Sequence, residues 1–268
     1  MFHKKYLVNT AEIICLTLLA SAGIILIALQ IKPLGFLILV FGLISLYYCP
    51  KKFIKELLLV YISLALLAIT QITTDTSYAH MFQMGTTLAL AVSIPYFVSR
   101  YIYKDHLVRF TFHHGRKWSH KEIAWIFITA TISYLLLPYY LKSTGAYLNW
   151  TVEPGIGNII RLFIGTNGLG IWDELFFVST VLGILRRFLP FSWANFIQSI
   201  LFTSFLYELG FTGWGFIMIF VFALIQGMVF KKSESLLYII TIHLTLDFIL
   251  FLALIEAHHP DWMPIFIT

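Results

Sequence analysis

The sequence predicts an all-α protein, a polytopic integral membrane helical bundle with about nine transmembrane helices. Of its 268 residues, 59% are hydrophobic and only 12% are charged, which is about half the charged fraction of an ordinary soluble domain. Apolar runs of the length that crosses the hydrocarbon core of a bilayer recur along the chain. The basic residues fall almost entirely in alternate connections between those runs. A soluble enzyme, a disordered chain and a nucleic-acid-binding protein are therefore excluded as first interpretations.

Nine apolar runs follow one another. In chain order they cover residues 11–30, 34–49, 53–72, 80–99, 122–141, 158–185, 191–209, 212–230 and 235–256. We expect each run to be helical, because a backbone in lipid must satisfy its own hydrogen bonds. The second run is short for a membrane span and the sixth is long. The first continues past Ala20-Ser21-Ala22, which resembles a signal-peptidase site, so we expect an uncleaved first helix.

The basic residues orient the predicted helices. Only Lys32, Lys142 and Arg161 of the 18 Lys and Arg residues fall on the side opposite to the N-terminus. Because Lys and Arg collect in cytoplasmic connections, the N-terminus is expected to be cytoplasmic and the C-terminus to lie across the membrane. We expect a multi-pass protein of the bacterial plasma membrane. The lipid bilayer then accounts for the net charge of +5, and no nucleic-acid partner is expected.

The longest inner connection covers residues 100–121 and divides the chain. Residues 1–121 form the predicted N-terminal transmembrane helices and basic cytoplasmic loop, and residues 122–268 form a C-terminal transmembrane core. We interpret the loop histidines, His106, His113, His114 and His120, as solvated. A metal site or an anionic-lipid site in this loop is the alternative.

Ionisable side chains at membrane depth are costly and usually functional. Apart from residues close to the ends of the predicted helices, such as Glu122, Arg161 and Glu256, we single out five in the second part: Asp173, Glu174, Glu208, His243 and Asp247. At 1.5 Å per helical residue, Glu174 lies about 18 Å from the inner surface and Asp247 about 22 Å. Their similar depth predicts a shared site. Glu208 lies nearer the outer end of its helix. Polar contacts between helices, worth about 1 kcal/mol each, are the structural alternative.

The spacing of these residues suggests their roles. His243 and Asp247 are four residues apart and share one helix face, so the carboxylate can orient the imidazole. Asp173 and Glu174 are adjacent, so their side chains diverge by about 100°. We expect one of them to act as a general base for water and the other to orient or cap. The sequence leaves open which one is the base.

These residues lie in a segment, 158–256, that resembles the CAAX-protease and bacteriocin-processing family of intramembrane proteases, also called Abi or CPBP. The family's three motifs are Glu-Glu-x-x-x-Arg, Phe-x-x-x-His and His-x-x-x-Asn or Asp. The first resembles Asp173-Glu174 with Val178 at the arginine position. The second begins at Phe202 and has Leu206 at the histidine position, followed by Tyr207 and Glu208, which are candidates to substitute. The third is intact as His243 to Asp247.

The resemblance implies an intramembrane endopeptidase that cleaves a membrane-associated or exported protein or peptide precursor by carboxylate-activated water. It implies catalytic roles for Glu174, Asp173, His243, Asp247 and Glu208, and no cofactor. The altered motif positions favour an alternative, an inactive scaffold that partners another membrane enzyme. Buried acids also occur in transporters and proton relays; zinc held by one histidine and the acids is a minor alternative.

Overall fold

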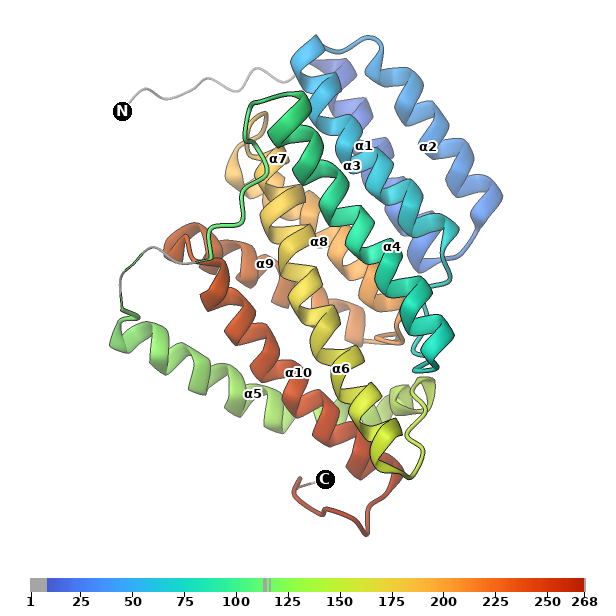
Figure 1. Ribbon diagram of the computed structural model, residues 1–268, viewed down its shortest axis with the longest axis vertical. Helices are drawn as coiled ribbons and strands as arrows, with labels where there is room; N and C mark the ends of the chain where they lie inside the picture. Colours follow the sequence, from blue (N-terminus) through green and yellow to red (C-terminus); the bar gives the residue numbers. More distant parts are fainter. Residues whose placement is uncertain (1–8, 113–114, 116, 268) are drawn as a thin grey trace.

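The computed structural model describes residues 9–112, 115 and 117–267 (Figure 1). Lys4, Lys5, His113, His114 and Arg116, which the sequence interpretation used, lie outside these residues. Within them the chain consists of helices and their connections. The prediction of an all-α fold is confirmed.

Nine helical segments coincide with the nine apolar runs. They are α1 (Thr10–Gly23) continued by η1 (Ile24–Ala28), α2 (Lys32–Leu46), α3 (Lys51–Ile69), α4 (Tyr78–Phe97) continued by η2 (Val98–Ile102), α5 (His120–Thr144), α6 (Ile156–Asp173) continued by η4 (Glu174–Val181) and α7 (Leu182–Leu185), α8 (Phe191–Glu208), α9 (Gly215–Ser233) and α10 (Leu236–His258). A short 3₁₀ turn, η3 (Ala146–Asn149), follows α5. Hydropathy therefore located every long helix that the structure describes.

Six of these segments are long and apolar enough to cross a membrane. They are Thr10–Ala28, Tyr78–Ile102, His120–Thr144, Ile156–Leu185, Gly215–Ser233 and Leu236–His258. The other three differ for visible reasons. Helix α2 has only 15 residues, α3 begins with a lysine-rich turn, and α8 contains the buried amides Asn195 and Gln198. The protein is a polytopic helical membrane protein.

The ends of the helices follow from local chemistry. Helix α5 begins at a capping box, in which Ser119 and Glu122 satisfy each other's backbone N–H groups. It ends at Gly145, whose φ of 70° is a left-handed conformation that suits glycine. At the start of α10 the Ser235 hydroxyl accepts from the Tyr238 N–H. These caps fix where α5 and α10 begin and so place their inward faces.

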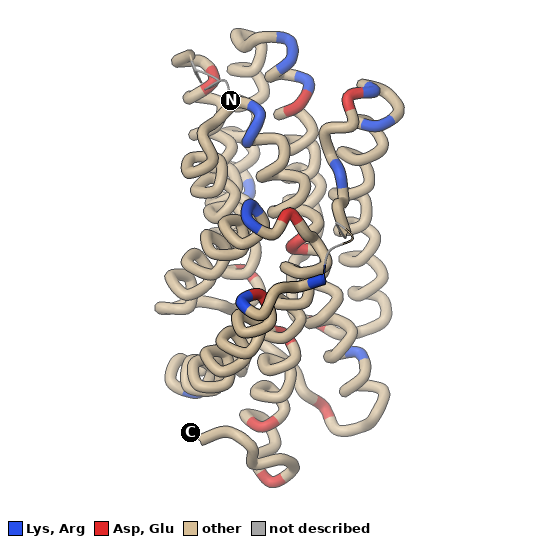
Figure 2. Tube along the Cα trace, turned by 90° about the vertical axis from the view of Figure 1, so that its left-hand side faces the viewer, with Lys and Arg blue, Asp and Glu red and all other residues tan. Residues whose placement is uncertain are grey.

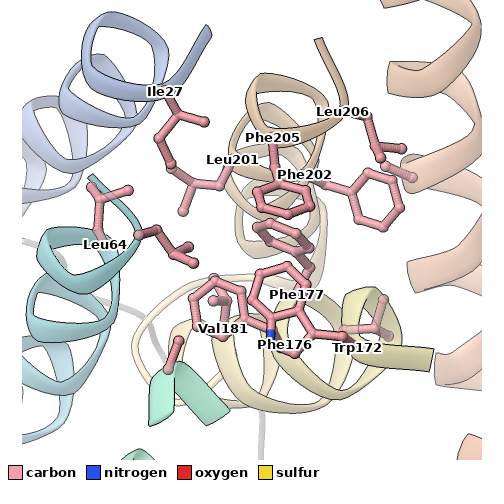
Figure 3. Close-up of a cluster of buried hydrophobic side chains, with 14 of the residues drawn as sticks. Ile27, Leu64, Trp172, Phe176, Phe177, Val181, Leu201, Phe202, Phe205 and Leu206 are labelled. Carbon is pink, nitrogen blue, oxygen red and sulfur yellow. The ribbon is translucent and has the colours of Figure 1, made fainter. Parts of the chain in front are cut away.

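The rod formed by α6, η4 and α7 occupies the centre of the molecule (Figure 1). Its η4 part contacts α4, α8, α9 and α10. Aromatic side chains fill the junction with α8 (Figure 3): Phe177 lies 5.1 Å from Phe202, and Trp172 lies 4.8 Å from Phe205, between ring centroids. The rod that carries Asp173 and Glu174 is thus packed against α8 in the buried core.

Charged residues are distributed unevenly along the long axis. Figure 2 shows Lys and Arg gathered towards the upper end, while the end of α10 lies towards the opposite end (Figure 1). The orientation of the chain in the membrane and the division at residue 121 stay predictions.

Candidate active site

The imidazole of His243, on α10, lies between the two adjacent acids. Its Nδ1 lies 2.8 Å from Glu174 Oε1, a hydrogen-bond distance. Its Nε2 lies 3.9 Å from Asp173 Oδ2. All three side chains are buried. The divergence of neighbouring helical side chains thus brings the two acids to opposite edges of one ring.

The helix changes its winding between these acids. Asp173 is the last residue of α6 and Glu174 is the first of η4, a π-helical segment of eight residues. The Thr180 hydroxyl donates to the Leu175 carbonyl at 2.9 Å, five residues back along this wider turn. Segments of π-helix occur frequently at functional sites. The π-helical segment and the buried acids therefore indicate the same candidate site.

Asp247 lies one turn after His243, and its Oδ1 is 3.7 Å from His243 Nε2. That separation is too long for a hydrogen bond. We expected Asp247 to orient the imidazole, but the carboxylate within hydrogen-bond distance of the ring is that of Glu174. Asp247 reaches its position because Gly170 of α6 has no side chain there. A Cβ at residue 170 would overlap the Asp247 carboxylate.

A glutamine completes the cluster. Gln226, on α9, donates from Nε2 to Glu174 Oε1 at 2.7 Å and to the Ile239 carbonyl at 3.2 Å. It is fully buried. Gln226 was not predicted, because the candidate residues in the sequence were chosen among ionisable side chains only. An amide in the middle of an apolar helix was the available signal.

A small cavity opens against this cluster. About 30 Å³ of it can admit water-sized molecules, and the polar residues of its lining include Asp173, His243, Asp247 and Thr166. Neither oxygen of Asp173 has a hydrogen-bond partner among the described residues. A cavity of about 15 Å³ suffices for one water molecule. The carboxylate therefore faces a space with room for a reacting water.

The structure does not bring Glu208 to this cluster. Its interaction partners are Gln30, in the connection before α2, and Lys32, the first residue of α2. Of the five residues singled out in the sequence, Asp173, Glu174, His243 and Asp247 are together and Glu208 is apart. Glu208 is the last residue of α8, and its separation from the cluster agrees with the outer position that the sequence indicated for it.

The residues at the altered motif positions are both apolar and both buried. Val178 is enclosed in the core, and Leu206 lines the cavity beside Asp173. Trp172, next to the acids, is a packing residue: its Nε1 donates to the Leu88 carbonyl at 2.7 Å and its ring stacks on Phe176. Within the described residues, no group of three or more His, Cys, Asp or Glu side chains has the arrangement of a metal site.

Fold and site together define a polytopic helical membrane protein with a buried cluster of carboxylates around one imidazole. Residues 155–249 match the model of the family described as Type II CAAX prenyl endopeptidase Rce1-like. The match contains Asp173, Glu174, His243 and Asp247, and it confirms the resemblance to CAAX-type intramembrane proteases over this segment. No curated protein and no solved structure shows a significant match.

Proposed function

We propose that the protein is an intramembrane endopeptidase that cleaves a membrane-associated or exported protein or peptide precursor with a carboxylate-activated water. One observation carries the proposal. His243 is held between Glu174 and Asp173 in a buried cavity that has room for water. The match of residues 155–249 to a protease family supports it.

Asp173 is the proposed general base. Both of its oxygens lack partners and it lines the cavity, whereas Glu174 Oε1 is already engaged by His243 and Gln226. The 3.9 Å between Asp173 and His243 Nε2 is a separation that a bridging water can span. Glu174 then serves as the positioning residue that fixes the imidazole.

The reaction balances with these groups alone. Asp173 takes a proton from the water as the water oxygen bonds to the scissile carbonyl carbon. Because His243 Nδ1 donates to Glu174, Nε2 carries a hydrogen only when the ring is an imidazolium. In that form Nε2–H stabilises the oxyanion that forms on the carbonyl oxygen. As the C–N bond breaks, Asp173 returns its proton to the amine nitrogen. The products are a carboxylic acid and an amine, and Asp173 is again a carboxylate.

The setting proposed for this reaction follows from the sequence. We propose that the N-terminus is cytoplasmic and that the C-terminus lies across the membrane, on the distribution of basic residues, and that the membrane is a bacterial plasma membrane. The proposal needs no cofactor, and zinc stays the alternative, for which chelation is the test.

The direct test compares peptide termini in membranes and medium from deletion cells complemented with wild type, Asp173→Asn or Glu174→Gln at matched expression. Specific new termini should appear with wild type and be lost with Asp173→Asn. If neither variant changes any terminus, the protease proposal is wrong.

A second candidate function is a scaffold for another membrane enzyme. Val178 and Leu206 favour it, because apolar side chains there replace the family's arginine and second histidine. In that case both acid variants should rescue the deletion phenotype without changing any terminus.

A further inference from the structure

A groove separates α5 from α9 and ends beside the candidate active site. About 420 Å³ of it can admit water-sized molecules, within the usual size range of ligand sites. Apolar side chains form most of its lining. Among them are Trp125 on α5, Trp214 directly before α9 and Val221 on α9. Gln226 also belongs to its lining. The groove therefore reaches the amide that holds Glu174.

Two side chains form a shared wall between this groove and the cavity at Asp173. Phe222 of α9 and Leu246 of α10 line both spaces. The ring of Phe222 stands edge to face against the His243 ring, with centroids 5.1 Å apart. A displacement of these two side chains would join the groove to the imidazole.

The hydrogen bonds of Gln226 fix which way its amide points. Both of its partners, a Glu174 oxygen and the Ile239 carbonyl, are acceptors here, so the amide nitrogen must face them. Its carbonyl oxygen, Oε1, is left on the other side, buried and without a partner among the described residues. A buried acceptor in this state is costly until it meets a donor. An N–H group arriving along the groove would satisfy it.

We propose that the groove between α5 and α9 binds an apolar stretch of the peptide substrate, with Gln226 Oε1 accepting a backbone N–H. The inference rests on the proposed function and names its substrate class. The occupant is a peptide because a lipid acyl chain is equally apolar but carries no donor for Oε1. Once seated, the peptide displaces Phe222 and presents its next carbonyl to His243. Gln226 is thus a positioning residue for both Glu174 and the substrate.

The test uses the purified full-length protein in lipid nanodiscs and measures labelling instead of cleavage. A pool of short apolar peptides with a central diazirine is photolysed on the protein, and the adducts are mapped by mass spectrometry. Adducts should concentrate on residues 125–137 and 214–226. The same pool with N-methylated backbones, which lack N–H donors, should label this region about tenfold less, the order expected for one lost buried hydrogen bond.

Two matched tryptophan variants on α9 locate the binding. Val221→Trp narrows the groove, whereas Met228→Trp lies outside its lining, and the two native side chains are similarly exposed, at 47% and 45%. Val221→Trp should remove the labelling and Met228→Trp should retain it. Thermal unfolding of both variants shows whether each is folded.

Three results would overturn the inference. They are absence of groove adducts, equal labelling by N-methylated peptides, and groove labelling only by a diazirine fatty acid, which would indicate a lipid site. Because labelling does not require cleavage, the two proposals fail separately. Groove labelling without acid-dependent termini refutes only the protease, and the reverse result refutes only the groove.

Discussion

The carboxylate of Asp247 occupies the space that a side chain at Gly170 would fill. The two residues lie on α10 and α6, the helices that carry the imidazole and the first acid. Their close approach sets the distance between these helices at the level of the cavity. Glycine at position 170 therefore contributes to the site by leaving space for the Asp247 carboxylate.

Gly170→Ala is therefore expected to displace Asp247 or push α10 away from α6. A misplacement of about 1 Å in a catalytic site can lower the rate about 100-fold. Release of the wild-type termini is the measurement. Gly168→Ala is the matched control on the same helix, because a Cβ there meets no described atom within 4 Å. Equal loss in both variants would contradict the role given to Gly170.

Gln226→Leu should lower processing because it removes a donor from Glu174 and loosens the imidazole. A lost buried hydrogen bond to a charged group corresponds to about 2 kcal/mol, or roughly 30-fold if it is felt fully in the transition state. Gln198→Leu is the control, since this buried amide of α8 bonds to Asn195, Ser199 and the Ala223 carbonyl instead. The thermal midpoint should fall in both variants and processing chiefly in the first. If Gln198→Leu lowers processing as much, Gln226 acts through stability only.

Glu208→Gln should leave processing near the wild-type rate. Its partners are Gln30 and Lys32, away from His243, so no reacting group loses a contact. Glu174→Gln, measured in parallel at equal expression, should reduce processing strongly, because the hydrogen bond to His243 Nδ1 changes. A comparable loss in both variants would restore Glu208 to the catalytic group.

Metal chelation provides a fourth check. Treatment of wild-type membranes with 1,10-phenanthroline should not alter the release of termini, since the proposed reaction uses only carboxylates and imidazole. Inhibition that added zinc reverses, and that the non-chelating 1,7-isomer does not cause, would favour the zinc alternative.

The sequence was sufficient for the helices and for most of the cluster. Hydropathy reports contact with lipid, so it located all nine helical segments that the structure describes. Counting residues from the basic helix ends predicted a similar depth in the membrane for Asp173, Glu174, His243 and Asp247. The same arithmetic placed Glu208 nearer the outer end of its helix. It stayed a candidate through the family resemblance, because depth along one axis leaves the direction of a side chain open.

The partner of the imidazole could not be predicted for a related reason. The i, i+4 spacing of His243 and Asp247 suggested a hydrogen bond within α10, yet the bond comes from Glu174 on another helix. Glu174 is the first residue of the π-helical segment that follows Asp173, and no residue pattern in the run predicted that winding. Gln226 is uncharged, and its hydrogen bond to Glu174 depends on which helix packs beside α9. The sequence alone therefore did not indicate its role.

The two acids flank the imidazole from consecutive positions of one rod, and this has a mechanical consequence. A small rotation of α6 and η4 about their common axis brings one carboxylate nearer to the ring while it carries the other away. The rotation of this one helix about its axis therefore sets how close the proposed base, Asp173, and the positioning residue, Glu174, lie to the His243 ring. A turn of that helix therefore changes both contacts of His243 at once.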